Sequence, residues 1–457
     1  MAIRMLLIEA TYTQESVEVS ALPLGLAYIA SFLRKEFGDT FEFKIVDEDV
    51  AEHIKSFQPD VVGISSVTKN YCLAKEYARI AKSNNIPVII GGVHISLLPQ
   101  NLTDDMDVGV MYEGEITIVE LMESFLANGR FEKANLYDIK GLVFRDHSGL
   151  IVTEPRGFVK HLDSIRYPAR DLLGTKEPAS MLTSRGCPYR CAFCSTSMFW
   201  GNKIRFASAR YVAEEIDSIY YYDKAKLITI YDDMFAFDSQ RVFAILRELR
   251  KTEAFGKVAF HCNTRADLLT DEMAEALHEM NVKAVGLGVE SGSQKVLDYL
   301  KTGGITVADN IRAISILKKH HIIPYCSFIL GSPQDNAVTL IETIKFIEDN
   351  KINYYDFHVL TPYPGTLVWD YAKQRGLVGD DMDWRILNMQ GGPSSESLIL
   401  SDRLSREEIK VAFRLMENRK RRYMRKASLL AILKNPFAYV FVVFRVILER
   451  YRGKVCH

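Results

Sequence analysis

The chain has 457 residues, of which 48% are hydrophobic and 25% are charged, and its formal net charge at pH 7 is -1. This length exceeds what one ordinary hydrophobic core supports and predicts about three domains. A charge so close to zero provides no general attraction for a polyanion, so we do not expect a nucleic-acid partner.

The segment 3–9 has the pattern of a strand, and no apolar signal segment precedes it. We therefore expect a cytoplasmic protein whose seven cysteines stay reduced. Cys262 and Cys326 stand within strand patterns, and we expect them to pack as small hydrophobic residues, as we do for Cys72.

The first part of the chain alternates short apolar runs with segments of helical period. The runs lie at 3–9, 43–47, 60–65, 87–92 and 108–112. This alternation predicts a doubly wound α/β domain over 1–135, with a parallel sheet covered by helices on both faces. Ligands of such sheets bind at the carboxyl ends of the strands. The candidate binding residues at those ends are Ser65, Ser66, Thr68, Gly91, Gly92, His94, Glu113, Gly114 and Glu115.

A linker with a β-hairpin is expected over 136–175, turning at Ser148-Gly149. The alternation then resumes over 176–375. Its six apolar runs lie at 180–184, 226–233, 258–264, 283–290, 323–331 and 354–360. Six strand–helix units predict a partial (β/α) barrel with its chemistry at the carboxyl ends of the strands. Residues 376–457 are expected to form a helical C-terminal extension.

Three cysteines stand close together on the loop after the first barrel strand, at Cys187, Cys191 and Cys194. Three thiolates at this spacing can surround one cubane iron–sulfur cluster and leave its fourth iron without a protein ligand. A structural zinc site would need a fourth ligand nearby, and the closest histidine in the sequence is His161. We therefore favour a [4Fe-4S] cluster over zinc.

The stretch TSRGCPYRCAFCS (183–195), with Phe193 directly before the last cysteine, resembles the cluster motif of the radical S-adenosylmethionine (radical SAM) superfamily. The resemblance implies that SAM chelates the free iron through its amino and carboxylate groups. One electron from the cluster then breaks a sulfur–carbon bond of SAM and yields a 5′-deoxyadenosyl radical. An electron donor such as flavodoxin or ferredoxin is also implied.

Polar segments at later strand ends support this resemblance. GVESGS, with Glu290 and Ser291, resembles the family's ribose-contact motif, and FILGSPQD, with Leu330, resembles its adenine-side segment. Helix capping and turn chemistry explain each residue equally well when it is taken alone, so the order of the segments along the chain is the evidence. No residue is assigned as a catalytic acid or base. The candidate cofactor-binding residues of the barrel are Phe193, Asp232, Asp233, Asn263, Arg265, Glu290, Ser291 and Leu330.

The doubly wound domain ahead of the barrel contains LPLGLAYIASFLR (22–34) and, at later strand ends, GGVH and YEGE. With these segments the chain resembles the cobalamin-binding radical SAM subfamily over about 1–375, which implies cobalamin between the two domains. The D-x-H-x-x-G loop, which supplies a histidine to the lower face of cobalt, is missing from VDEDVAEH (46–53). We therefore expect cobalamin without a lower-face histidine; the alternative is a domain that has lost the cofactor and serves the substrate.

An unactivated carbon does not attack the SAM methyl group, whereas an adenosyl radical can remove a hydrogen from it and methylcobalamin can then deliver a methyl group. Methylation of such a carbon, in a small, lipid-like or pigment substrate, is the leading hypothesis. Ring formation or skeleton rearrangement, with or without cobalamin, is the alternative. A transfer RNA methylthiotransferase would need a second N-terminal cluster, but Cys72 alone precedes residue 180. A non-catalytic iron–sulfur protein is the least favoured.

The C-terminal segment from Ser405 begins with a capping box, Ser405 with Glu408, and predicts an amphipathic helix that ends in basic residues. The apolar stretch after Pro436 is too short for a bilayer, which needs ~20 residues. Two hypotheses stay open: a peripheral anchor on the inner face of a membrane, or a terminal helix packed on the barrel with a solvated basic face.

Overall fold

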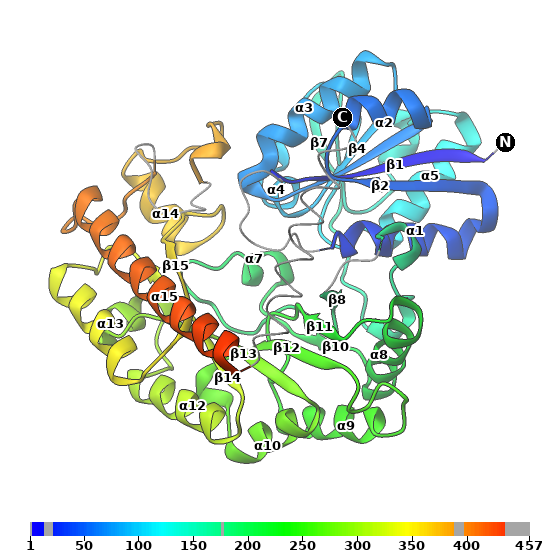
Figure 1. Ribbon diagram of the computed structural model, residues 1–457. Coiled ribbons are helices and arrows are strands. Elements are labelled where there is room, and N and C mark those ends of the chain that lie inside the picture. Colours follow the sequence, from blue (N-terminus) through cyan, green and yellow to red (C-terminus); the bar gives the residue numbers. More distant parts are fainter. Residues whose placement is uncertain (1, 13–21, 175–177, 388–396, 435–457) are drawn as a thin grey trace.

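The computed structural model describes residues 2–12, 22–174, 178–387 and 397–434. They form two α/β domains, one after the other along the chain, and a long C-terminal helix that lies against the second domain (Figure 1). The predicted fold class is confirmed, because a mainly parallel sheet with helices on both faces precedes a six-stranded parallel sheet and a helical extension.

Seven strands form the sheet of the front domain, in the order β2-β1-β3-β4-β5-β6-β7. The strands are β1 (Ile3–Ala10), β2 (Phe41–Val46), β3 (Val61–Ser66), β4 (Val88–Gly91), β5 (Val108–Val110), β6 (Leu142–Asp146) and β7 (Gly149–Val152). β1 to β5 pair in parallel, whereas β6 and β7 form an antiparallel hairpin that pairs with β5. The hairpin expected in the linker therefore extends the front sheet beyond residue 135.

Helices cover both faces of this sheet because its strands are apolar on both sides. The helices are α1 (Leu24–Phe37), α2 (Val50–Phe57), α3 (Tyr71–Ser83), α4 (Val93–Leu97), α5 (Glu115–Asn128) and α6 (Lys133–Leu136). Successive side chains of a strand point to opposite faces. Met5 and Leu7 of β1 accordingly pack with α1 and α5, while Leu6 and Ile8 pack with α2 and α3.

Six parallel strands form the sheet of the second domain, in the order β15-β14-β13-β12-β11-β8. They are β8 (Ala179–Met181), β11 (Leu227–Ile230), β12 (Ala259–Thr264), β13 (Val282–Glu290), β14 (Ile323–Leu330) and β15 (Tyr354–Val359). The helices are α7 (Thr196–Trp200), α8 (Ala209–Asp223), α9 (Ser239–Leu249), α10 (Asp271–Glu279), α11 (Gln294–Lys301), α12 (Val307–Lys319), α13 (Ala337–Asp349) and α14 (Leu367–Gln374). The larger helices lie along the outer side of the curved sheet (Figure 1), as in a partial (β/α) barrel.

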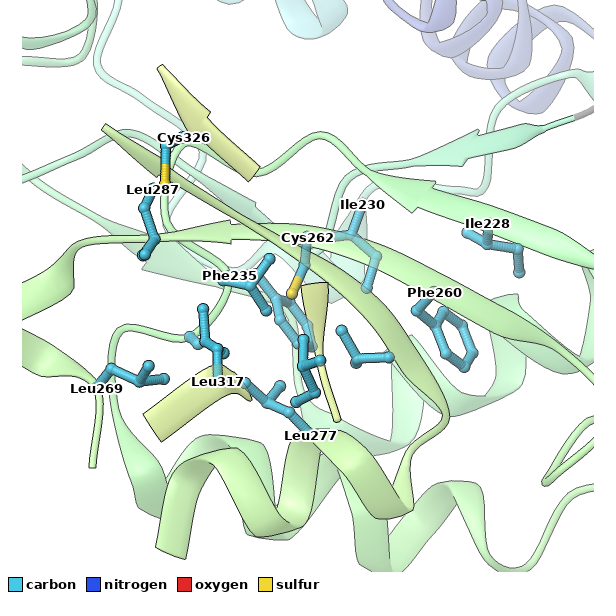
Figure 2. Close-up of a cluster of buried hydrophobic side chains, with 14 of the residues drawn as sticks. Ile228, Ile230, Phe235, Phe260, Cys262, Leu269, Leu277, Leu287, Leu317 and Cys326 are labelled. Atoms are coloured by element: carbon cyan, nitrogen blue, oxygen red, sulfur yellow. The ribbon is translucent and has the colours of Figure 1, made fainter. Parts of the chain in front are cut away.

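The core of the barrel is apolar and contains two of the cysteines. Figure 2 shows Cys262 and Cys326 among the aliphatic and aromatic side chains of this core. Both are buried, and burial raises the pKa of the Cys326 thiol to about 12. The prediction that these two cysteines pack as small hydrophobic residues is confirmed.

A short antiparallel ladder, which the sequence did not predict, frames the cysteine loop. β9 (Ser184–Arg185) pairs with β10 (Arg205–Phe206), and Arg185 stands directly opposite Arg205. The three cysteines lie on the chain between these two strands. The ladder therefore fixes both ends of the segment that contains the predicted cluster ligands.

Helix α15 (Arg406–Lys434) packs on the barrel. Its N-terminus has the predicted capping box, because the Glu408 carboxylate accepts from the Ser405 N–H at 2.7 Å and the Glu408 N–H donates to the Ser405 hydroxyl at 3.2 Å. Ile409 and Met416 are buried in the barrel core. Among the described residues, no helix is both long and apolar enough to cross a membrane. The stretch after Pro436, on which the anchor hypothesis depends, lies outside the described residues.

The chain that follows the last barrel helix also contacts the front domain. Trp384, in η7 (Trp384–Leu387), lies edge-on to His94, with ring centroids 4.7 Å apart. The Asn101 side-chain amide donates to the Asp380 carbonyl oxygen at 2.7 Å. The extension therefore connects the barrel to the front domain a second time, in addition to the linker.

Candidate active site between the two domains

A cavity of about 300 Å³ lies between the front domain and the barrel. The front sheet contributes its carboxyl edge, and the barrel contributes β9, α7 and the end of β11. Seven residues that the sequence predicted line it together: Ser65, Gly91, Gly92, Glu113, Gly114, Glu115 and Asp233. The predicted strand-end residues of the two domains therefore meet at one place.

The floor of the cavity is an apolar slot within the front domain. It is lined by Met5, Leu7, Leu26, Ile29, Ile89, Val110 and Ile118. Gly63 keeps this slot open, because a Cβ at this position would lie 2.9 Å from Leu7 Cδ2. Gly92 has a φ of +99°, and a Cβ there would lie 2.5 Å from the Ser66 carbonyl oxygen, so the turn requires glycine. The slot can accept a flat apolar group from the carboxyl edge of the sheet.

The three cysteines stand together on the loop between β9 and α7, and each is partly exposed. The Cys194 N–H donates to the Cys191 carbonyl oxygen at 3.1 Å. Burial, together with the charges of Asp233 and the other two thiols, raises the pKa of Cys187 to about 11. Burial also raises the pKa of Cys191. Metal binding must therefore displace protons from these thiols.

Asp232 and Asp233 follow β11 but have different environments. The Asp232 carboxylate is fully buried and accepts from the N–H of Thr183 at 2.6 Å and from the hydroxyl of Ser184 at 2.7 Å. It therefore holds the segment before the cysteine loop, and this burial does not support its predicted contact with a cofactor. Asp233 lines the cavity, accepts from the Thr196 hydroxyl at 3.2 Å, and has its pKa raised by burial.

Glu290 lies at the rim of the barrel, beside the cysteine loop. Its carboxylate pairs with Lys301 at 2.7 Å, and both side chains are buried. The Lys301 ammonium lies 5.8 Å from the centre of the Phe193 ring, and its charge acts on the Cys191 thiol. The structure therefore brings predicted residues Phe193 and Glu290 together with the cysteines, through a lysine that the sequence did not single out.

Arg265 supports the cysteine loop. Its guanidinium carbon lies 4.0 Å from the centre of the Tyr189 ring, and its Nε donates to Asp267 at 2.8 Å. Asn263 is exposed at the rim, and its side-chain oxygen lies over Gly286, where a Cβ would be 2.1 Å away from it. Of these two predicted residues, Asn263 is the one that presents free polar atoms at the rim.

Several predicted residues are enclosed in the protein. The Ser291 hydroxyl lies 3.1 Å from that of Thr343, and Leu330 is buried in the barrel core. Ser66 and Thr68 are buried beside the cavity without lining it. These placements do not support the predicted direct contacts of the four residues with a cofactor, because packing and local hydrogen bonds take up their side chains.

His94 is fully buried behind the cavity. Its ring stacks on Tyr71 with centroids 3.8 Å apart, and Nε2 lies 2.9 Å from Asn101 Oδ1. Burial lowers the pKa of His94 to about 3, so its imidazole is neutral at physiological pH. The structure does not place His94 on the cavity, and its role as a cofactor contact stays a prediction.

Sequence reasoning missed several residues that line the cavity. They are Tyr28, Tyr112, Arg185, Phe199, Trp200 and Tyr231. Arg185 lies within the quoted stretch 183–195 and Tyr231 directly precedes Asp232, so their position in the sequence was an available signal. Tyr112 has a φ of 61°, a backbone conformation that is rare for a bulky residue and that the sequence does not predict.

Two family models match the chain: the Radical SAM superfamily over 181–347 and the B12 binding domain over 14–122. An uncharacterized methyltransferase of Pyrococcus horikoshii is 33% identical over 383 residues, which cover 79% of this chain and 81% of that protein. These matches define a radical SAM enzyme with a cobalamin-binding front domain. The chain belongs to the cobalamin-binding group of the radical SAM superfamily, whose cofactors are a [4Fe-4S] cluster, SAM and cobalamin.

Two further relatives differ in the reaction that their names state. The anaerobic magnesium-protoporphyrin IX monomethyl ester cyclase of Cereibacter sphaeroides is 25% identical, over 93% of this chain and 71% of the cyclase. The hopanoid C-3 methylase of Methylococcus capsulatus is 28% identical, over 80% of this chain and 71% of the methylase. Both methylation and ring formation therefore occur among similar proteins.

The fold matches a solved radical SAM methyltransferase, TsrM of Kitasatospora setae, whose structure contains cobalamin and a [4Fe-4S] cluster. The TM-score is 0.68 and the match covers 82% of this chain and 75% of that protein, at 18% sequence identity. At this identity the match shows a shared fold, with a front domain ahead of a barrel.

The residues present fit these cofactors. Cys187, Cys191 and Cys194 are the three thiols that would hold the cluster. Among the described residues, no three His, Cys, Asp or Glu side chains converge on a single metal ion, but each thiolate of a cubane binds a different iron atom and the three need not converge. The apolar slot and the glycine-lined edge above it would hold cobalamin. No histidine is among the described residues on the cavity, and binding without a lower-face histidine stays a prediction.

Proposed function

We propose that this chain methylates an unactivated carbon of a small apolar substrate, of the pigment or lipid class. The observation that carries the proposal is the single cavity that joins the cysteine loop, at Gly186, to the carboxyl edge of the front sheet. When bound, the cluster with SAM supplies a carbon-centred radical and cobalamin supplies a methyl group.

The side chains on the barrel side of the cavity suit this chemistry. Leu182, Phe199 and Trp200 present apolar surface, which excludes water from a reactive intermediate. Asp233 and Tyr231 add polar groups close to Gly186. The apolar wall would bind the body of the substrate, and these two side chains would orient its polar groups.

The names of two relatives support the pigment or lipid class. The Cereibacter cyclase is named for a porphyrin and the Methylococcus methylase for a hopanoid. Both names describe apolar small molecules, which agrees with the apolar wall of this cavity. We further propose a flavodoxin or ferredoxin as electron donor, a cytoplasmic location, and peripheral membrane contact through the segment after Pro436.

Ring formation is the second candidate, because the cyclase relative aligns with 93% of this chain. The two reactions differ in what becomes of SAM. Methylation converts one SAM to S-adenosylhomocysteine, as the methyl source, and another to deoxyadenosine. Ring formation needs deoxyadenosine alone.

The test is anaerobic reconstitution with iron and sulfide, then cobalamin, followed by absorption and electron paramagnetic resonance (EPR) spectra. A four-iron signal that SAM perturbs and a cobalamin spectrum are expected. Incubation with reductant, trideuteromethyl SAM and a panel of porphyrins and hopanoids should give a product heavier by one labelled methyl group. Formation of deoxyadenosine without S-adenosylhomocysteine, or of a cyclised product, would contradict methylation and favour ring formation.

A further inference from the structure

Four buried charged side chains connect the front domain to the barrel. Glu113 and Glu115 follow β5, and Arg185 and Arg205 belong to the β9–β10 ladder. Their side chains are at most 14% exposed. Arg185 lies 2.7 Å from a Glu113 oxygen and 2.5 Å from a Glu115 oxygen, and Arg205 lies 3.0 Å from Glu113. We call these four residues the Glu–Arg clamp.

Glu113 is the centre of the clamp. Both terminal nitrogens of Arg205 donate to its two oxygens at 3.0 Å, and Arg185 donates to Oε1 at 2.7 Å. The Val159 N–H of the linker donates to Oε2 at 2.7 Å. Charge-assisted hydrogen bonds from several directions hold a carboxylate in a single position. Glu113 thereby fixes the front domain, the linker and the ladder relative to one another.

The ladder depends on the carboxylates of the front domain. Arg185 and Arg205 are directly opposite each other in the β9–β10 pair, and like charges at such positions are destabilising. Glu113 contacts both guanidinium groups and compensates their repulsion. The Glu113 carboxylate therefore contributes to the stability of the ladder around the cysteine loop.

The clamp is directly connected to the cysteine loop through the backbone. Arg185 is separated from Cys187 by Gly186, which has a φ of +92° and no room for a Cβ, since that atom would lie 2.2 Å from the Lys203 carbonyl oxygen. On the other side, Glu113 and Glu115 both line the cavity. The clamp therefore joins the metal-binding loop to the rim of the cobalamin-binding cavity.

Stability alone does not explain four buried charges here. Apolar residues of similar volume usually give equal or greater stability than a buried ion pair. Directional bonds, however, define one geometry where apolar packing allows several. We propose that the Glu–Arg clamp sets the distance between the cluster and the ligand of the front domain, and that these four side chains are positioning residues. The identity of that ligand rests on the proposed function; the clamp does not.

The decisive experiment measures this distance directly. A nitroxide is attached to Val152→Cys, an exposed site on β7 of the front domain, in a background in which Cys72 and Cys456, the cysteines outside the cluster loop and the barrel core, are replaced by Ser. Pulsed EPR then measures the distance distribution from the nitroxide to the reduced cluster. Glu113→Gln should broaden or shift this distribution while iron content stays unchanged. Glu120→Gln is the matched control, because Glu120 also pairs with an arginine, Arg156, which belongs to the linker and not to the barrel.

A second measurement follows the coupling of the two half-reactions. Misplacement by about 1 Å costs roughly a hundredfold in rate, so Glu113→Gln should lower the methylated product per deoxyadenosine by roughly ten- to a hundredfold. Arg205→Lys keeps the charge but not the paired bonds and should give an intermediate loss; it also replaces Glu113→Gln if that variant does not fold. If Glu113→Gln lowers the melting temperature but leaves the distance distribution unchanged, the proposed positioning role of the clamp is wrong. A wild-type protein without a cobalamin spectrum would overturn the proposed function instead.

Discussion

Lys301 Nζ lies 2.7 Å from Glu290 Oε1 at the rim of the barrel, and the two side chains are 9% and 6% exposed. Burial acts against the charge of Lys301, but the neighbouring Glu290 and Cys191 raise its pKa. The pair therefore keeps a cation beside the cysteine loop.

Lys301→Met should be strongly destabilising, because it leaves the Glu290 charge buried without a partner. Removal of one member of a buried pair typically costs about 3–5 kcal/mol. The double variant Lys301→Met/Glu290→Gln should recover most of this loss, since no unpaired charge remains. Thermal unfolding of the four proteins in this double-mutant cycle measures the coupling. Additive effects of the two substitutions would show that the pair does not interact.

Cys191→Ala should abolish both the four-iron signal and deoxyadenosine formation, because two thiolates cannot hold the cubane in place of three. Cys326→Ala is the control: this thiol is buried in the barrel core, so its loss should cost about 1 kcal/mol of stability and leave the cluster intact. Iron content and EPR spectra of both variants test the assignment. Deoxyadenosine formation by Cys191→Ala would refute it.

Gly63→Val should impair cobalamin binding without affecting the cluster. The added side chain enters the apolar slot, where even a Cβ lies 2.9 Å from Leu7. Overpacking of about 1–3 kcal/mol corresponds to an increase in Kd of about five- to 150-fold. Gly25→Ala is the matched control, since Gly25 also lines the cavity but a Cβ there meets no atom within 4 Å. Equal Kd values for cobalamin in the two variants would place the cofactor elsewhere.

Glu9 should make the free protein less stable as the pH rises. Burial raises its pKa from 4.5 to about 7, a bond with Ser65 partly opposes the shift, and Asp47 adds to it. A carboxyl group with a raised folded-state pKa contributes stability that is fully present below about pH 4.5 and is lost as the pH rises through about 7. Because Glu9 is partly exposed, we expect a loss of about 1–2 kcal/mol between pH 5 and pH 8.

Melting temperatures across this pH range measure the effect of Glu9. Glu9→Gln should flatten that part of the profile, because the amide does not ionise. Glu42→Gln, at an exposed position on β2, should leave it unchanged. A profile that Glu9→Gln does not alter would show that Glu9 ionises as freely in the folded protein as in the unfolded chain.

The fold class and the class of chemistry follow from the sequence, which also predicts the three cysteines that would hold the cluster. Apolar runs that alternate with helical segments can satisfy their backbone and bury their side chains in few ways other than parallel α/β architecture. The spacing of Cys187, Cys191 and Cys194 is equally local information, because one short loop carries all three predicted ligands. Strand ends such as Gly92 and Asp233 were predictable because parallel strands bring their carboxyl ends to one edge.

What each polar side chain at those strand ends contacts depends on the tertiary structure. Asp232 and Asp233 are neighbours in the chain, yet Asp232 is buried and bonded to Thr183 and Ser184, whereas Asp233 lines the cavity. Glu113 and Glu115 were predicted as cofactor contacts, but they pair with arginines that lie some seventy to ninety positions later in the chain. A charged residue at a strand end has the same sequence pattern whether it binds a ligand or pairs with a distant opposite charge. Which of the two it contacts depends on how the two sheets pack against each other.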